Sequence, residues 1–167
     1  MVDAVRITDK KDVAIAAILA RRGASAAMIG KALGADLPLD PSWTASRSLV
    51  MIGSGPGTWL AHHEGMTTGW AGDLQTRLAG IASVSDQSGA YRIFRIEGPG
   101  ARRLLQRGAA VDLDDSAFPA GSVAVTAIAY LDVIIRRLKE ADSYELAVYR
   151  SSAEGFLRWL DAAVDRL

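Results

Sequence analysis

The distribution of apolar residues along the first third of the chain predicts one strand-like segment followed by a helix. The run VAIAAILA (13–20) is apolar throughout; its alanines favour a helix, whereas its length and lack of polar breaks suit a buried strand. The segment SAAMIGKAL (25–33) has helical spacing of its apolar residues. Ser25 is placed to cap the start of that helix, and Gly34 to take a left-handed conformation at its end.

The next segment predicts a loop, a hairpin and a second helix. LPLDPSW (37–43) contains two prolines and is typical of a loop. SLVMI and TWLAHHE, on either side of the glycine-rich turn GSGPG (53–57), predict two paired strands. A helix is expected to open at Thr67 or Thr68 and to run through Leu78.

The second half shows the same succession of patterns. AYRIFRIE (90–97) is rich in β-branched and aromatic residues and predicts a strand, and Gly98-Pro99 is expected to start a short helix that ends at Gly108. VAVTAIAYL and VIIRRL predict a strand pair over 123–138. In SYELAVY (143–149) apolar and polar residues alternate, which indicates a half-buried strand.

The last helix has the clearest apolar face. Ser151 and Glu154 have the spacing of a capping box, which predicts the start of the helix. Phe156 and Leu160 lie near the centre of its apolar stripe and are expected in the core. Trp159 lies at the margin of that stripe, where a contact with a partner protein is the better hypothesis.

These patterns predict an α+β fold of antiparallel sheets with helices packed on one face. Both halves run strand, short helix, strand pair and a helix that contains a tryptophan, so we expect a single domain over residues 1–167 with half-repeats at 12–86 and 90–165. Each half would then be a ferredoxin-like βαββαβ unit. If the halves match, VAIAAILA corresponds to YRIFRIE and is a strand.

Composition and charge narrow the range of functions. Half of the 167 residues are apolar and 23% are charged, which is enough for a packed core. Nineteen basic residues balance nineteen acidic ones, so neither nucleic acid nor an anionic membrane is expected as a main partner. No segment has the pattern of a signal peptide or the length of a membrane-spanning helix, and we therefore expect a cytoplasmic protein.

Few residues are available for catalysis or metal binding. The chain has no cysteine, which excludes disulfides, cysteine-ligated zinc and a cysteine nucleophile. Its two histidines are adjacent, His62 and His63, and on a strand they would point to opposite faces rather than to one metal ion. GSGPG lacks the Lys-Ser/Thr end of a phosphate loop and is expected to be a turn. No catalytic residue and no metal site is predicted.

Three further groups of residues are candidates for a functional role. The acidic run Asp112-Leu113-Asp114-Asp115 lacks the pattern of a calcium loop and is expected to be a solvated loop. Several arginines are expected to make surface ion pairs or subunit contacts rather than to bind phosphates; they are Arg102, Arg103, Arg107, Arg136 and Arg137. The four tryptophans are expected mostly in the core, with at least one plausible interface anchor among them; they are Trp43, Trp59, Trp70 and Trp159.

The segment 83–113 resembles the folate-binding aminomethyltransferase family, typified by the T-protein of the glycine cleavage system. The motifs that carry the resemblance are Ser85-Asp86-Gln87-Ser88, RIFRIEG, Gly98-Pro99-Gly100, Leu104-Leu105 and Asp112. The resemblance implies that Asp112 is the one candidate cofactor-binding residue, because it matches an aspartate of those enzymes. The residue before it is Val111, where those enzymes usually have asparagine.

From about residue 12 to 165, the chain resembles the gamma-subunit family of heterotetrameric sarcosine oxidases. The motifs, in order, are IGSGPGTWLA, SDQSG, IEGPGARRLL, FPAGS and the ending YELAVYRS…FLRWL. The resemblance implies a bacterial complex of sarcosine catabolism that demethylates sarcosine to glycine and passes the one-carbon unit to tetrahydrofolate. FAD, FMN, NAD and tetrahydrofolate would be bound by other subunits, and none by this chain.

The resemblance also implies partners: the alpha, beta and delta subunits, with the closest contact to the large, folate-binding alpha subunit. The first hypothesis is therefore a non-catalytic gamma subunit that supports assembly. The second is a free-standing, aminomethyltransferase-like module that binds tetrahydrofolate unaided. A third is an unrelated ferredoxin-like interaction domain, which would bind neither folate nor flavin-bearing subunits.

Overall fold

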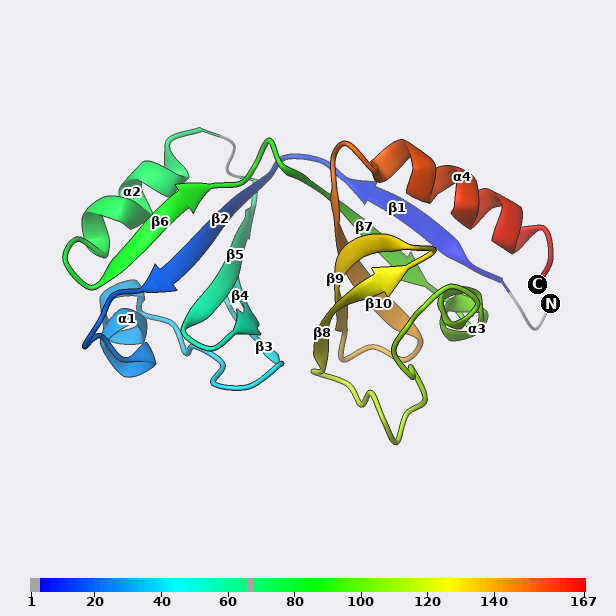
Figure 1. Ribbon diagram of the computed structural model, residues 1–167, viewed down its shortest axis with the longest axis horizontal. Coiled ribbons are helices and arrows are strands. Elements are labelled where there is room, and N and C mark those ends of the chain that lie inside the picture. The colour runs from blue at the N-terminus through cyan, green and yellow to red at the C-terminus, as the bar shows by residue number, and fades with distance from the viewer. Residues whose placement is uncertain (1–3, 66–67) are drawn as a thin grey trace. The chain divides into compact units, whose positions relative to one another are not determined.

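The computed structural model describes residues 4–65 and 68–167, which form four helices and ten strands (Figure 1). The strands build two five-stranded sheets, and all of the strand pairs within the two sheets are antiparallel. The predicted α+β fold is confirmed. The chain divides into two compact units, an N-terminal unit of residues 12–89 and a C-terminal unit of residues 90–167 with the first strand of the chain.

The N-terminal unit contains five strands and two helices: β2 (Val13–Ala20), α1 (Ala26–Leu33), β3 (Trp43–Ser46), β4 (Leu49–Gly55), β5 (Thr58–Glu64), α2 (Trp70–Arg77) and β6 (Ala82–Asp86). Its sheet has the order β3-β4-β5-β2-β6. VAIAAILA is therefore a strand, and it lies between β5 and β6 in the sheet.

Both helices of this unit pack on one face of its sheet. Ala14, Ala16 and Ile18 of β2 form one buried cluster with residues of α1 and α2. The Ser25 hydroxyl accepts a hydrogen bond from the Met28 N–H at 3.2 Å, and Gly34 ends α1 in the left-handed conformation, so both predicted caps of α1 are confirmed.

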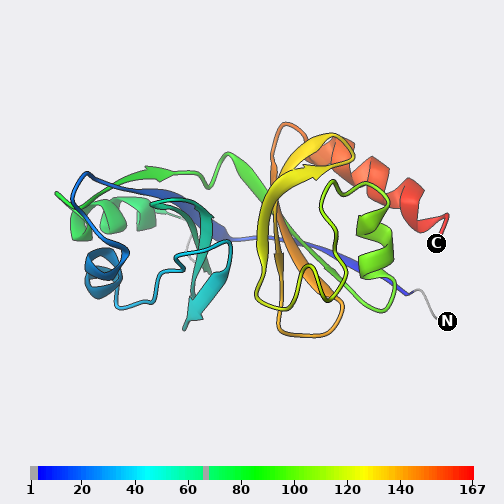
Figure 2. The same ribbon diagram turned by 60° about the horizontal axis from the view of Figure 1, so that its bottom comes forward.

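The C-terminal unit contains five strands and two helices: β1 (Arg6–Lys10), β7 (Tyr91–Glu97), α3 (Ala101–Gln106), β8 (Val123–Ile128), β9 (Leu131–Arg137), β10 (Ser143–Tyr149) and α4 (Ala153–Val164). Its sheet has the order β1-β7-β10-β9-β8. The N-terminal strand β1 lies antiparallel to β7, with Ile7 opposite Ile96 (Figures 1 and 2). The predicted core positions Phe156 and Leu160 of α4 are both fully buried.

The two sheets have the same topology. In the N-terminal unit, the strands β4, β5, β2 and β6 with the helices α1 and α2 form a βαββαβ unit, and β3 adds an edge strand. In the C-terminal unit, β9, β10, β7 and β1 take the same places, with β8 at the corresponding edge. The strand that completes the C-terminal unit is thus the first strand of the chain.

Two predictions about the last strand and helix are wrong. Residues 143–148 of β10 are buried on both faces rather than on one, and the polar Glu145 among them is paired with Arg136. The predicted capping box does not form: Ser152 is the N-cap residue and makes no capping hydrogen bond with its side chain. The Glu154 carboxylate instead accepts a hydrogen bond from Arg92 at 2.6 Å.

Two helices begin later than predicted. α2 begins at Trp70, after Gly69 in the left-handed conformation, rather than at Thr68; the alternative start at Thr67 lies outside the described residues. α3 begins at Ala101 rather than at Gly98-Pro99. Ala101, Leu104 and Leu105 form the inner face of α3 and are fully buried.

Candidate functional site

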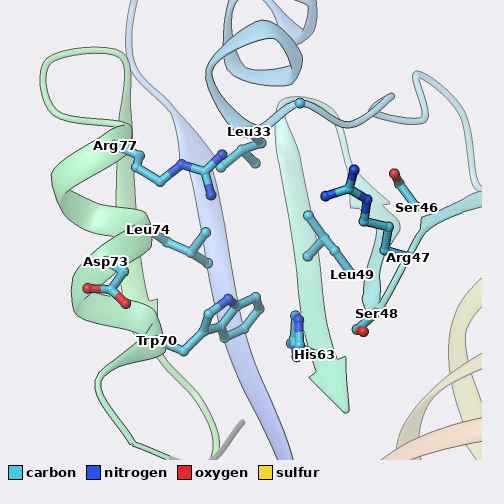
Figure 3. Close-up of a pocket in the computed structure, with 11 residues that line it drawn as sticks. Leu33, Ser46, Arg47, Ser48, Leu49, His63, Trp70, Asp73, Leu74 and Arg77 are labelled. Atoms are coloured by element: carbon cyan, nitrogen blue, oxygen red, sulfur yellow. The ribbon is translucent and has the colours of Figure 1, made fainter. Parts of the chain in front are cut away.

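A cavity of about 640 Å³ opens between the helices and the sheet of the N-terminal unit (Figure 3). Its apolar wall comes from three elements: Leu33 of α1, Leu49 of β4, and Trp70 with Leu74 of α2. A volume of this size is typical of pockets for small molecules.

The rim of this pocket carries two guanidinium groups from different elements. Arg47 lies in the two-residue turn between β3 and β4, and Arg77 lies in the last turn of α2. The Arg77 guanidinium donates a hydrogen bond to the Ala32 carbonyl at 2.9 Å, which fixes its position. Within residues 4–65 and 68–167, the Arg47 side chain forms no ion pair. The sequence analysis did not single out either arginine.

One predicted residue, His63, also lines the pocket. Its ring lies 5.8 Å from the Trp70 ring at an angle of 55°, and its Nδ1 is 2.8 Å from the Glu64 carbonyl. A carbonyl oxygen only accepts, so the Nδ1–H of His63 donates this hydrogen bond. His62 is 1% exposed. The predicted placement of the two histidines on opposite faces of the strand is confirmed, but His63 is partly buried at the pocket rather than turned outward to solvent.

The glycine-rich segment 53–57 is the predicted turn rather than a phosphate loop. Gly53 and Gly55 lie in β4 at a β-bulge, and the chain reverses before Thr58. A side chain at Gly53 would collide with the Asp40 carbonyl, which would lie 2.4 Å from its Cβ. This glycine therefore allows a close backbone approach within the protein.

Asp112 lies exposed in the loop that follows α3. Its carboxylate accepts a hydrogen bond from the Asp114 N–H at 2.9 Å, which forms a local turn. Asp112 does not line the 640 Å³ pocket.

The neighbouring Asp114 and Asp115 are exposed, as expected of a solvated loop, and each also pairs with an arginine. Asp114 accepts from Arg102 at 2.8 Å, and Asp115 lies 2.8 Å from Arg137. The hydrogen bonds from Ser116 are the main reason why the pKa of Asp114 is lowered. Among the residues that the structure describes, no group of three or more His, Asp or Glu side chains is placed to hold a metal ion.

The predicted surface arginines fall into two groups. Arg102 makes an exposed ion pair, and Arg103 and Arg107 donate to backbone carbonyls near the C-terminus. Arg136 and Arg137 are buried, 5% and 8% exposed, which contradicts the surface prediction for this pair. Both are buried because they face carboxylates, Glu145 and Asp115.

The tryptophans are distributed mostly as expected. Trp59 and Trp70 are buried, and the Trp59 indole donates to the Pro38 carbonyl at 2.8 Å. Trp159 is partly buried and lies against Phe156, with ring centroids 5.8 Å apart. Its position at the margin of the α4 stripe is confirmed, whereas the contact with a partner stays a prediction.

The described residues include no helix that is both long and apolar enough to span a membrane. The class of protein that the fold defines is an α+β protein of two antiparallel, ferredoxin-like sheet units. The model of the family described as "Sarcosine oxidase, gamma subunit family" matches residues 19–165. The chain therefore belongs to the sarcosine oxidase gamma subunit family.

Solved structures show the same fold at low sequence identity. A chain of the heterotetrameric sarcosine oxidase from Corynebacterium sp. U-96, determined with pyrrole 2-carboxylate, has a TM-score of 0.89 and 22% identity. The match covers 99% of this chain and 86% of that chain. The glycine cleavage system aminomethyltransferase T from Bartonella henselae has a TM-score of 0.66 and 14% identity. This second match covers 95% of this chain but 45% of that one. A search of curated protein sequences gave no match.

Proposed function

We propose that this chain is the non-catalytic gamma subunit of a heterotetrameric sarcosine oxidase. The observation that carries the proposal is the family match over residues 19–165, which spans both units. The similarity of fold over 99% of the chain to a subunit of such an enzyme supports it. We infer that the chain acts as one gamma-type domain over residues 1–167.

In this proposal the partners are the alpha, beta and delta subunits, with the closest contact to alpha. FAD, FMN, NAD and tetrahydrofolate are bound by those subunits, in the cytoplasm of a bacterium, and this chain supports their assembly. The complex demethylates sarcosine oxidatively to glycine and transfers the one-carbon unit to tetrahydrofolate.

The geometry around Asp112 supports a structural rather than a catalytic role. A general acid or base must lie within hydrogen-bond reach of the group on which it acts. The Asp112 carboxylate is exposed and accepts a hydrogen bond within its own loop. We therefore assign Asp112 to the structure of the loop that follows α3.

Coexpression tests the assembly. A tagged copy of this chain is coexpressed with the alpha, beta and delta subunits, and the captured material is scanned for flavin absorbance and for sarcosine oxidation. We expect all four subunits in equal amounts, with the flavin spectrum. The same chain expressed alone is the control and is expected to be colourless. Capture of the chain without flavin-bearing subunits would contradict the proposal.

Two further measurements separate this proposal from a free-standing tetrahydrofolate-binding module. Calorimetric titration of the isolated chain with tetrahydrofolate is expected to show no binding; saturable binding would favour the module. In the assembled complex, Asp112→Ala is expected to change sarcosine turnover by less than about threefold. A loss of about 10²–10⁴, as for a general acid or base, would make Asp112 catalytic.

A further inference from the structure

The pocket of the N-terminal unit combines an apolar wall with a cationic rim, and no part of the proposed function uses it. Trp70 and Leu74 form one side of it and Leu49 the other, while Arg47 and Arg77 lie at its upper rim (Figure 3). We propose that this pocket binds a small organic acid whose single carboxylate contacts the two arginines and whose aromatic or aliphatic body lies on the apolar wall.

The two guanidinium groups are suited to bind a carboxylate. They lie on opposite sides of one pocket, Arg77 on α2 and Arg47 on the β3–β4 turn (Figure 3). Arg77 uses one donor on the Ala32 carbonyl, which holds its guanidinium in place and leaves its other N–H groups available. Arg47 has no counter-ion among the described residues, so a bound carboxylate would supply one.

The backbone of the turn holds Arg47 at the pocket. Arg47 has a φ of +55°, a left-handed conformation that is unfavourable for a residue with a side chain. Asparagine and glycine adopt this conformation more readily. This positive φ belongs to the two-residue hairpin turn between β3 and β4, which places Arg47 at the rim of the cavity.

The wall and the remaining charges define the rest of the ligand. The Trp70 ring, with His63 tilted against it, offers a flat apolar surface for a ring or chain of similar size. Asp73 also lines the pocket, one turn of α2 before Arg77. In Figure 3 its carboxylate lies on the side of α2 away from Trp70 and Leu74, so the two arginines are the charged groups offered to a ligand.

Benzoate is a suitable probe, because it carries one carboxylate on a flat apolar ring. The full-length chain, labelled with ¹⁵N, is titrated with benzoate while amide and indole N–H shifts are recorded. We expect saturable shifts at Trp70, Arg47 and Arg77, with a Kd of about 1 mM for a probe of this size. Benzamide, which has the same shape without the charge, is expected to bind at least about tenfold more weakly.

Two variants test the arginines separately. Arg47→Asn removes the charge and suits the left-handed turn, and Arg77→Gln keeps a donor for the Ala32 carbonyl. Each is expected to weaken benzoate binding at least about fivefold, with the dispersed spectrum of a folded chain. Arg22→Gln, an exposed arginine outside the pocket, is the matched control and should leave the Kd within about twofold.

The proposal is wrong if the benzoate shifts lie outside the pocket, or if benzamide binds as tightly as benzoate. It is also wrong if both pocket variants bind benzoate like the wild-type chain. This test needs no partner subunit, so its outcome is independent of whether the chain assembles into a sarcosine oxidase.

Discussion

The two units of this protein share one topology but fill it differently. In the N-terminal unit, Ala16 of β2 lies opposite Ala61 of β5; on the corresponding strands of the C-terminal unit, Phe94 lies opposite Leu146. The helices that follow β5 and β10 also differ, since α2 has eight residues and α4 has twelve. Large side chains under a long helix give a closed core, whereas alanines under a short helix leave room for a pocket.

The units also differ in their buried charges. The ion pairs of Arg92 with Asp9, and of Arg136 with Glu145, both lie in the C-terminal unit. The first joins β7 to the N-terminal strand β1, and the second joins β9 to β10. One topology thus accommodates both a C-terminal unit with ion pairs between its strands and an N-terminal unit with a pocket between its helices and its sheet.

The largest effect is expected from the buried ion pair. Glu145 is 3% exposed and lies 3.0 Å from Arg136 and 3.7 Å from Lys10. Glu145→Gln leaves buried cationic groups without this carboxylate, which should reduce the free energy of unfolding by about 3–5 kcal/mol in urea denaturation. Glu97→Gln is the control: Glu97 pairs with Arg95 on the same strand at partial exposure, and its loss should cost less than about 1 kcal/mol. Equal losses of unfolding free energy in the two variants would contradict the conclusion that burial makes the Glu145 pair the more important one.

The next largest effect is expected from truncating one buried leucine in the core of each unit. Leu160 of α4 is fully buried in the core of the C-terminal unit, whereas Leu74 of α2, 1% exposed, borders the pocket of the N-terminal unit. Leu160→Ala should cost about 4 kcal/mol and Leu74→Ala about 2 kcal/mol, the upper and lower parts of the range for buried leucines. The N-terminal unit already contains a cavity, so the second truncation removes fewer contacts. A larger loss of unfolding free energy for Leu74→Ala than for Leu160→Ala would contradict the looser packing proposed beneath α2.

Much of this fold could be predicted from the sequence where the local pattern is strong. The caps of α1, the hairpin around Gly57 and the core positions of α4 follow from patterns of a few residues. Three strands, β1, β3 and β6, were not predicted. RITDK of β1 is mostly polar, and it is a strand because it pairs with β7, more than 80 residues later in the chain. Pairing at that distance leaves no local signal.

The candidate site could be predicted only in part. His63 and Trp70 were singled out by residue type, but Arg47 and Arg77 look like ordinary surface arginines in the sequence. They meet at one pocket because a hairpin turn and the end of a helix come together in the fold. The buried Arg136 and Arg137 show the same limit, since their carboxylate partners are distant in sequence or lie in a loop.

A smaller effect should appear at acid pH. Burial raises the pKa of Asp9, but hydrogen bonds from Lys11 and Arg92 outweigh it, so the pKa of Asp9 is lowered overall. Its stabilisation is therefore present above the ordinary pKa of about 4 and is lost as the pH falls through the lower folded value. Asp9→Asn should reduce the free energy of unfolding by about 1.5 kcal/mol at neutral pH, and the difference from wild type should shrink below about pH 4.

In the N-terminal unit, backbone and side-chain hydrogen bonds with Ser88 lower the pKa of the exposed Asp86. Asp86→Asn should change the free energy of unfolding less than Asp9→Asn does. A cost of Asp9→Asn that does not vary with pH would exclude this explanation.

The smallest effect concerns the corresponding hairpin turns of the two sheets. In the C-terminal unit the turn between β8 and β9 consists of Ala129 and Tyr130, both left-handed, with φ of 53° and 64°. Two residues with positive φ define the turn type for which Asn-Gly is preferred, because asparagine and glycine adopt positive φ at the lowest energetic cost. The Tyr130 side chain is fully exposed, so its removal costs no packing within this chain. The double variant Ala129→Asn with Tyr130→Gly should therefore raise the free energy of unfolding by about 1 kcal/mol, a shift of a few degrees in Tm. Tyr130→Ala, which keeps the backbone strain, should not raise the free energy of unfolding.

The β3–β4 turn has one residue with positive φ, so Arg47→Asn should raise the free energy of unfolding by about half as much. Equal stabilisation by Tyr130→Ala and by the double variant would show that the side chain, rather than the turn backbone, is the source of the effect.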